Sequence, residues 1–136
     1  MNLKIPKSIP SNFCIAPFIS TRPEPRHKNS PCAYGALDIP QPGLSASNKW
    51  HSKELNQLRQ DFIDNKQPSA CNRCWQEERA GKESLRQRTL TYQPDAYEDL
   101  IVSGRWVDGP ISITFKSSNV CNLACRSCGS HDSNQF

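Results

Sequence analysis

The sequence predicts an α+β fold: a small, loop-rich, cysteine-bearing module with two helices, followed by one strand that leads into a loop of cysteines. Eight of the eleven prolines lie in residues 6–42, where they oppose long helices and central strands. Two later stretches have helical features, and "ISITF" at 111–115 alternates apolar and polar residues as a strand does. Seven cysteines are spread over these parts.

The first helix is predicted to begin near Ser52 and to end shortly beyond Lys66. The Ser52 hydroxyl can cap free backbone amides, and Glu54 is well placed in the first turn. Pro68 forces the end of the helix. Its apolar residues fall on one face at helical spacing: Leu55, Leu58, Phe62 and Ile63.

A second helix is predicted from about Trp75 to Arg88, directly after "CNRC". Residues 89–110 are expected to form a connector with a short helix or strand before the turn at Gly109 and Pro110. Three tryptophans, Trp50, Trp75 and Trp106, are expected in the core and are given no site role.

The second helix would carry a basic face of Arg79, Lys82 and Arg86. Glu78 lies four residues before Lys82, and Glu83 lies three before Arg86, so ion pairing on a solvated helix is the prediction. The net charge of +4 permits an anionic partner and does not require one. Nucleic acid is therefore not the expected partner.

The cysteines point to metal. No signal peptide or membrane-spanning stretch is seen, so the chain is expected in the cytoplasm, where cysteines stay as thiols or bind metal. Seven cysteines cannot all pair in disulfides. Hydrophobic residues make up only 35% of the chain, so a bound metal could also help hold the fold together.

Cys121, Cys125 and Cys128 form a Cys-x-x-x-Cys-x-x-Cys run on the loop that leaves the predicted strand. One such loop can wrap a compact object, and thiolates are the ligands that iron–sulfur clusters require. Three cysteines would leave one iron of a four-iron cluster open, as a chemical role requires.

The stretch "ISITFKSSNVCNLACRSCG" resembles the opening strand and cluster loop of radical S-adenosylmethionine (SAM) enzymes. The resemblance implies that Cys121, Cys125 and Cys128 hold a 4Fe-4S cluster whose open iron binds SAM. Reductive cleavage of SAM then gives a 5'-deoxyadenosyl radical, which takes hydrogen from a substrate. One residue departs from the family pattern: Ser127 stands where an aromatic residue often precedes the third cysteine.

The other four cysteines are expected to form a second site. Cys71 and Cys74 open a predicted helix, whose first amides would stabilise bound thiolates. Cys14 and Cys32 would join them from the proline-rich loops. The surrounding pattern, "NFCIAPF", "PCAYG" and "PSACNRCWQEERAGKESLRQR", is similar to SPASM or twitch type domains of radical SAM proteins, which implies an auxiliary iron–sulfur cluster here.

These resemblances imply three parts: an auxiliary-cluster region at 1–88, a connector at 89–110, and the start of a radical SAM domain at 111–136. They imply an α/β barrel of partial TIM type, of which only the first strand and cluster loop are present. We therefore expect these 136 residues alone to lack enzymatic turnover. A ferredoxin or flavodoxin is implied as electron donor, and a peptide or protein as one class of substrate. No membrane partner is expected.

Zinc is the alternative at both sites. His131 follows the run at Cys121 to Cys128 and could complete a three-cysteine, one-histidine site. The other four cysteines could hold a structural zinc, although zinc ribbons usually present two close pairs. The chain would then be a non-enzymatic zinc module that contacts nucleic acid or an acidic protein. A thioredoxin-like role for Cys71 and Cys74 would need a preceding strand in a βαβ unit.

Overall fold

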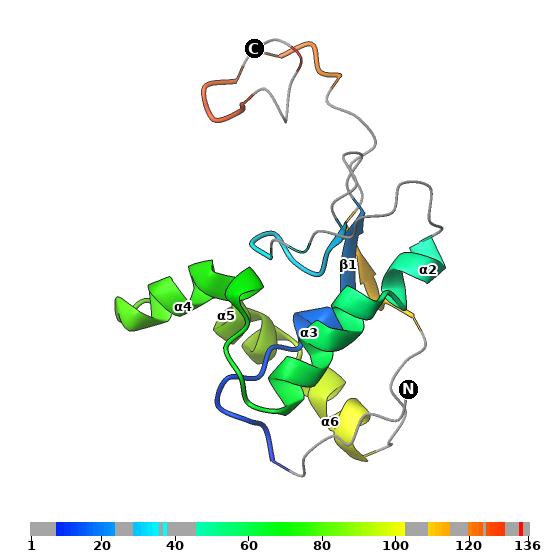
Figure 1. Cartoon of the computed structure of the whole chain (residues 1–136). Helices are drawn as coiled ribbons and strands as arrows, with labels where there is room; N and C mark the ends of the chain where they lie inside the picture. The colour runs from blue at the N-terminus through cyan, green and yellow to red at the C-terminus, as the bar shows by residue number, and fades with distance from the viewer. Residues whose placement is uncertain are drawn as a thin grey trace.

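The computed structural model describes residues 8–23, 29–35, 37, 46–102, 109–114, 120–123, 125–129 and 134 (Figure 1). Within these residues the elements follow one another in a fixed order: α1 (Ala16–Ile19), β1 (Ser20–Pro23), β2 (Asn29–Ser30), α2 (Ala46–Trp50), α3 (Lys53–Ile63), the 3-10 helix η1 (Ser69–Cys71), α4 (Asn72–Arg79), α5 (Leu85–Tyr92), α6 (Pro94–Val102) and β3 (Ser112–Ile113).

A small sheet has the strand order β2-β1-β3. β1 pairs with β2 in antiparallel fashion and with β3 in parallel, with Ser20 opposite Ser112. Cys14 precedes β1 and Cys32 follows β2, so both cysteines belong to the end of the sheet where β1 begins. Because β3 runs parallel to β1, the chain leaves β3 at the opposite end.

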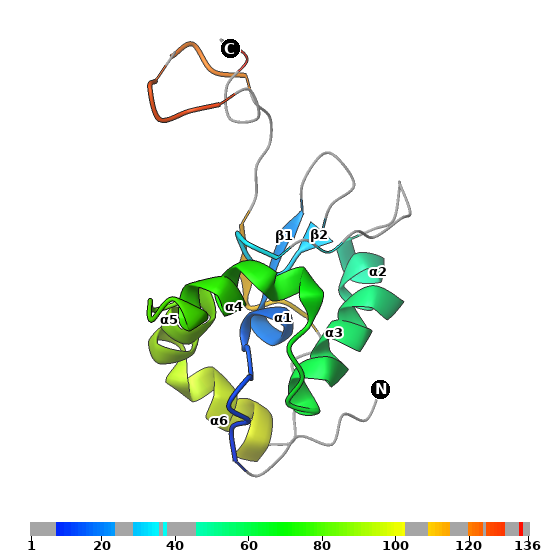
Figure 2. The ribbon, with the colours of Figure 1, turned by 60° about the vertical axis from the view of Figure 1, so that its left-hand side comes forward.

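The core surrounds α1, which contacts both α3 and α5 and lies among the other helices in Figure 2. The Phe13 ring stacks on Phe18, with ring centroids 5.2 Å apart, and meets Tyr97 edge-on at 4.9 Å. Phe62 and Trp75 bring α3 and α4 into the same cluster, with ring centroids 6.3 Å apart. This aromatic packing joins the first residues of the described chain to α3, α4 and α6.

The first predicted helix is confirmed at its start, because Ser52 caps α3 and its hydroxyl accepts a hydrogen bond from the Leu55 amide at 3.3 Å. Its predicted end is wrong: α3 stops at Ile63. Asn65 there has a positive φ of 59°, a conformation that ends helices, and its side-chain oxygen accepts a hydrogen bond from the Asn12 amide at 2.9 Å. A contact distant in sequence thus fixes the end of α3.

The single helix predicted from Trp75 to Arg88 is also wrong, because two helices, α4 and α5, occupy this stretch. Gly81 lies between them with φ of 70°, which glycine adopts without strain. Ser84 then starts α5 with a capping box, in which the Ser84 hydroxyl and the Gln87 side chain each satisfy a backbone amide of the other residue.

This break overturns the predicted basic face. Arg79 and Lys82 are exposed, but Arg86 is buried and pairs with Glu78 across the break, with Nη2 2.7 Å from Oε2. The predicted partner of Glu78 was Lys82, at helical spacing. The chain reversal at Gly81 explains why Glu78 instead meets a residue eight positions later.

The predicted connector holds the end of α5 and the whole of α6, and the predicted strand is β3, at Ser112–Ile113. Phe115 and Trp106 lie outside the described residues, whereas Trp50 and Trp75 are buried as expected. Of the helices in the described ranges, none is both long and apolar enough to cross a membrane.

Candidate metal centre

Four cysteines line one cavity, as the sequence predicts for its second site: Cys14, Cys32, Cys71 and Cys74. Cys14 lies just before α1, and Cys32 lies in the turn that follows β2. Cys71 is the N-cap of α4 and Cys74 lies in its first turn, so the close pair does open a helix. The element before that helix is η1, not a strand. Three separate parts of the chain therefore contribute the thiols.

Backbone amides hydrogen-bond to three of the four sulfur atoms. The Gly35 amide donates to Cys32 Sγ at 3.2 Å, and the Ala16 backbone makes a hydrogen bond to Cys14. The backbone of Arg86 makes one to Cys74. Such bonds favour a thiolate over a thiol and tune iron–sulfur centres.

Burial acts against thiolates here. Burial is the main reason why the pKa of Cys14 is raised well above its ordinary value, and it also raises the pKa of Cys74. The pKa of Cys71 is raised to about 12 by burial and by the nearby Cys32 and Cys74, against the lowering effect of Arg86. Without a metal these three thiols therefore hold their protons, and a bound cation would have to displace them.

Arg86 brings a positive charge to the cavity wall. Its guanidinium lies in a polar network in which Glu78 accepts hydrogen bonds from Nε at 2.8 Å and from Nη2 at 2.7 Å. The Ser84 hydroxyl donates to the same carboxylate at 2.6 Å. Burial alone would raise the pKa of Glu78, but the hydrogen bonds from Arg86 and Ser84 hold that pKa below its ordinary value.

The donor set suits a thiophilic metal or an iron–sulfur cluster, because four sulfurs share one cavity and a cation faces them. Among the described residues, no three side chains of histidine, cysteine, aspartate or glutamate lie close enough together to bind one metal ion. The thiols thus share a cavity and interact electrostatically, and ligation would require their side chains to turn.

The other predicted cluster ligands, Cys121, Cys125 and Cys128, lie on a separate loop near the end of the chain (Figure 1). Cys125 is exposed and the other two are half-buried. The Leu123 amide donates to Cys121 Sγ at 3.4 Å, and the Cys128 amide donates to the Cys125 carbonyl at 3.0 Å. The loop therefore turns back on itself. His131, the alternative zinc ligand, lies outside the described residues.

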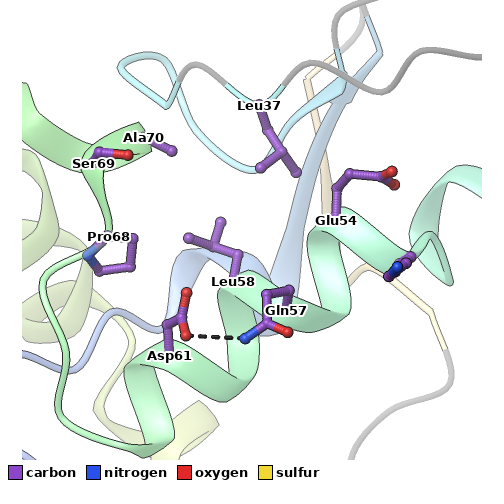
Figure 3. A pocket seen from close by; sticks show the side chains of 9 residues that line it. Leu37, Glu54, Gln57, Leu58, Asp61, Pro68, Ser69 and Ala70 are labelled. Carbon is purple, nitrogen blue, oxygen red and sulfur yellow. Dashed lines mark hydrogen bonds between the residues drawn. The ribbon is translucent and has the colours of Figure 1, made fainter.

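A second concavity, of about 390 Å³, lies between α3 and η1 (Figure 3). Leu58 and Leu37 form an apolar part, and Gln57 donates to Asp61 along one wall at 3.0 Å. The opposite wall includes Ala70, the residue before Cys71. This groove shares no lining residue with the four-cysteine cavity, although their walls are adjacent in sequence.

Two residues of the centre were missed from the sequence. The helical spacing predicts a solvated face for Arg86, and the sequence predicts no site role for Gly35. A capping-box pattern, Ser84 followed by Gln87, does mark the start of a new helix and could have shown that Arg86 does not continue the face of α4. No local pattern announces the amide of Gly35.

No model of a known protein family, no curated protein and no solved structure matches the chain.

Proposed function

We propose that the chain is an iron–sulfur protein in which Cys14, Cys32, Cys71 and Cys74 hold an auxiliary cluster. One observation carries the proposal: four thiols from three separate parts of the chain line one cavity. Four cysteine thiolates are a common ligand set of iron–sulfur clusters, and thiols in a reducing compartment stay free to bind metal. The backbone hydrogen bonds to three of the sulfurs support the same function.

More specifically, we propose that the chain belongs to a radical SAM enzyme that acts in the cytoplasm. Cys121, Cys125 and Cys128 would hold a 4Fe-4S cluster, to which SAM binds. With the cluster and SAM both bound, and with an electron supplied by a ferredoxin or flavodoxin, the cluster would cleave SAM to a 5'-deoxyadenosyl radical. This radical would take hydrogen from a substrate. The turn within the loop, with its hydrogen bond from Leu123 to Cys121, supports a wrapping role for these residues. A peptide or protein is the substrate class that the motifs favour.

The test is a count of iron, acid-labile sulfide and zinc on the chain purified without oxygen. Two cluster sites predict more than one four-iron cluster per chain. A variant with Cys14, Cys32, Cys71 and Cys74 changed to alanine should lose one cluster, and a variant with Cys121, Cys125 and Cys128 changed to alanine should lose the other. If the wild-type chain holds zinc and no acid-labile sulfide, the proposed iron–sulfur function is wrong.

The radical SAM part has its own test. The chain is reconstituted with iron and sulfide and incubated with SAM and a reductant, and the 5'-deoxyadenosine formed is measured. The same assay is run on any longer protein that contains this chain. We expect binding of SAM to perturb the electron paramagnetic resonance spectrum of the cluster at Cys121, Cys125 and Cys128. If neither the spectrum changes nor 5'-deoxyadenosine forms, the cluster of this loop is not a SAM site.

The second candidate function is a structural zinc module, favoured by the small size of the four-cysteine cavity. Its volume is about 20 Å³, close to the space that one water molecule occupies. One ion needs less of this space than a cluster does, and for either the thiol side chains would have to turn. The metal count above separates the two candidates, since zinc brings no sulfide.

A further inference from the structure

We propose that Arg86 is the countercharge of the four-cysteine site and that, together with Glu78, it sets the reduction potential of the cluster held there. The inference rests on the proposed iron–sulfur function and adds the residues that regulate the site. It starts from the position of Arg86, which is buried, with 7% of its surface exposed, and lines the same cavity as the four thiols.

The guanidinium of Arg86 is held on every side. Nη1 donates to the carbonyl of Ser11 at 3.0 Å and to that of Phe13 at 2.8 Å, directly before Cys14. Nε and Nη2 hold the two oxygens of Glu78. The face of the group lies 5.0 Å from the centroid of Trp75, the residue after Cys74. These contacts hold the charge of Arg86 beside the cavity.

The same residue reaches the thiols by two routes. Its backbone hydrogen-bonds to Cys74, and its positive charge acts on Cys71 across the cavity. Four thiolates would bring four negative charges into a buried place, and one-electron reduction of a cluster adds another. Charges interact more strongly where water is excluded, so a fixed cation stabilises the reduced cluster relative to the oxidised one.

Glu78 opposes part of this effect, because its carboxylate neutralises the cation that faces the thiols. Its side chain is 19% exposed and Arg86 is its partner, with Nη2 2.7 Å from Oε2. The two residues should therefore shift the potential in opposite directions when each is made neutral. A purely structural role would give no such opposition, since loss of either partner would loosen the same contact.

The experiment uses the chain with Cys121, Cys125 and Cys128 changed to alanine, so that only the four-cysteine site can hold a cluster. The midpoint potential of the reconstituted cluster is measured by dithionite titration with mediators in this background. Arg86→Gln should lower the potential so that the ratio of reduced to oxidised cluster falls about tenfold at a fixed potential, about 59 mV for a one-electron couple. Glu78→Gln should raise the potential, and Arg86→Lys should stay near the parent.

Opposite shifts in Arg86→Gln and Glu78→Gln support the inference. Shifts in the same direction, or no shift in either, overturn it. If Arg86→Gln takes up no cluster, Glu78→Gln still decides, because that variant keeps the cation: a raised potential supports the inference and an unchanged one overturns it.

Failure of the proposed function gives a different result. If the parent chain takes up zinc and no sulfide, the iron–sulfur function fails, and with it the role in the potential. The countercharge role is then decided by zinc affinity in competition with a chelator. Arg86→Gln should weaken the affinity about tenfold and Glu78→Gln should not; equal affinities overturn the role of Arg86.

Discussion

The backbone amide of Gly35 points at the sulfur of Cys32, 3.2 Å away. A Cβ at position 35 would lie 3.0 Å from the Ser30 hydroxyl, closer than an ordinary contact, and 3.4 Å from Cys32 Sγ. The Ser30 hydroxyl lies 2.5 Å from the carbonyl oxygens of both Cys32 and Gly35, and it donates its one proton to one of them at a time. A side chain at position 35 would therefore have to displace the Ser30 hydroxyl by a few tenths of an ångström.

Gly35→Ala should therefore weaken metal binding at the four-cysteine site about tenfold, which corresponds to about 1.4 kcal/mol. The measurement is competition for the bound metal with a chelator of known affinity. Gly109→Ala is the matched control, since a Cβ at that position would meet nothing within 4 Å. Equal affinities of the two variants would show that the Cys32 turn tolerates a side chain.

In the metal-free chain, Cys125 should react with iodoacetamide at least tenfold faster than Cys14 or Cys71. Cys125 is exposed, whereas burial raises the pKa of Cys14 well above its ordinary value and raises that of Cys71 to about 12. Thiolates are the reacting form, so a raised pKa slows alkylation. Mass spectrometry of peptides at timed intervals, at pH 8 with a chelator, gives the rates. Similar rates for all three cysteines would contradict the buried site.

Because of the ion pair between Glu78 and Arg86, the free energy of unfolding should fall as the pH becomes acidic. The pKa of Glu78 is lower in the folded chain than its ordinary value of 4.5, so its contribution is complete above that value and is lost as the pH falls through the folded pKa. Urea unfolding with a chelator present should show wild type more stable than Glu78→Gln at pH 6. The difference should shrink below pH 4. A difference that stays constant over this range would exclude the linkage.

Tyr34 should protect the centre from solvent. It lines the four-cysteine cavity, and the guanidinium carbon of Arg73 lies 3.7 Å from the centroid of its ring. Tyr34→Ala should speed the loss of the bound metal to a chelator or to oxygen severalfold, followed by absorbance. Tyr92→Ala is the control, because Tyr92 is 76% exposed and does not line the cavity. If both variants lose metal at the wild-type rate, Tyr34 does not shield the centre.

The sequence was most informative where short-range chemistry decides the structure. Ser52 caps α3 as predicted, and the Cys71 and Cys74 pair opens a helix as predicted. The grouping of four cysteines away from the other three also followed from spacing and from the resemblance of the motifs. These features depend on neighbours within a few residues, or on a residue type, cysteine, that has few uses.

The predictions that are wrong concern features that depend on contacts distant in sequence. The end of α3 is fixed by Asn12 binding Asn65, and neither residue indicates this by itself. A continuous helix would place Arg86 on the surface. The turn at Gly81 brings Arg86 instead to Glu78 and to the Phe13 carbonyl, just before Cys14. Helical spacing cannot report a partner that lies beyond the end of the helix.

The parallel pairing of β1 with β3 also sets an order of events during synthesis. Ser20 can pair with Ser112, and the sheet can be completed, only after Ser112 has been synthesised. Every residue that lines the four-cysteine cavity, from Cys14 to Thr89, leaves the ribosome earlier. Chains fold from the amino terminus as they emerge. The nascent chain can therefore gather its four thiols before β3, which follows them in the described residues, has emerged to pair with β1.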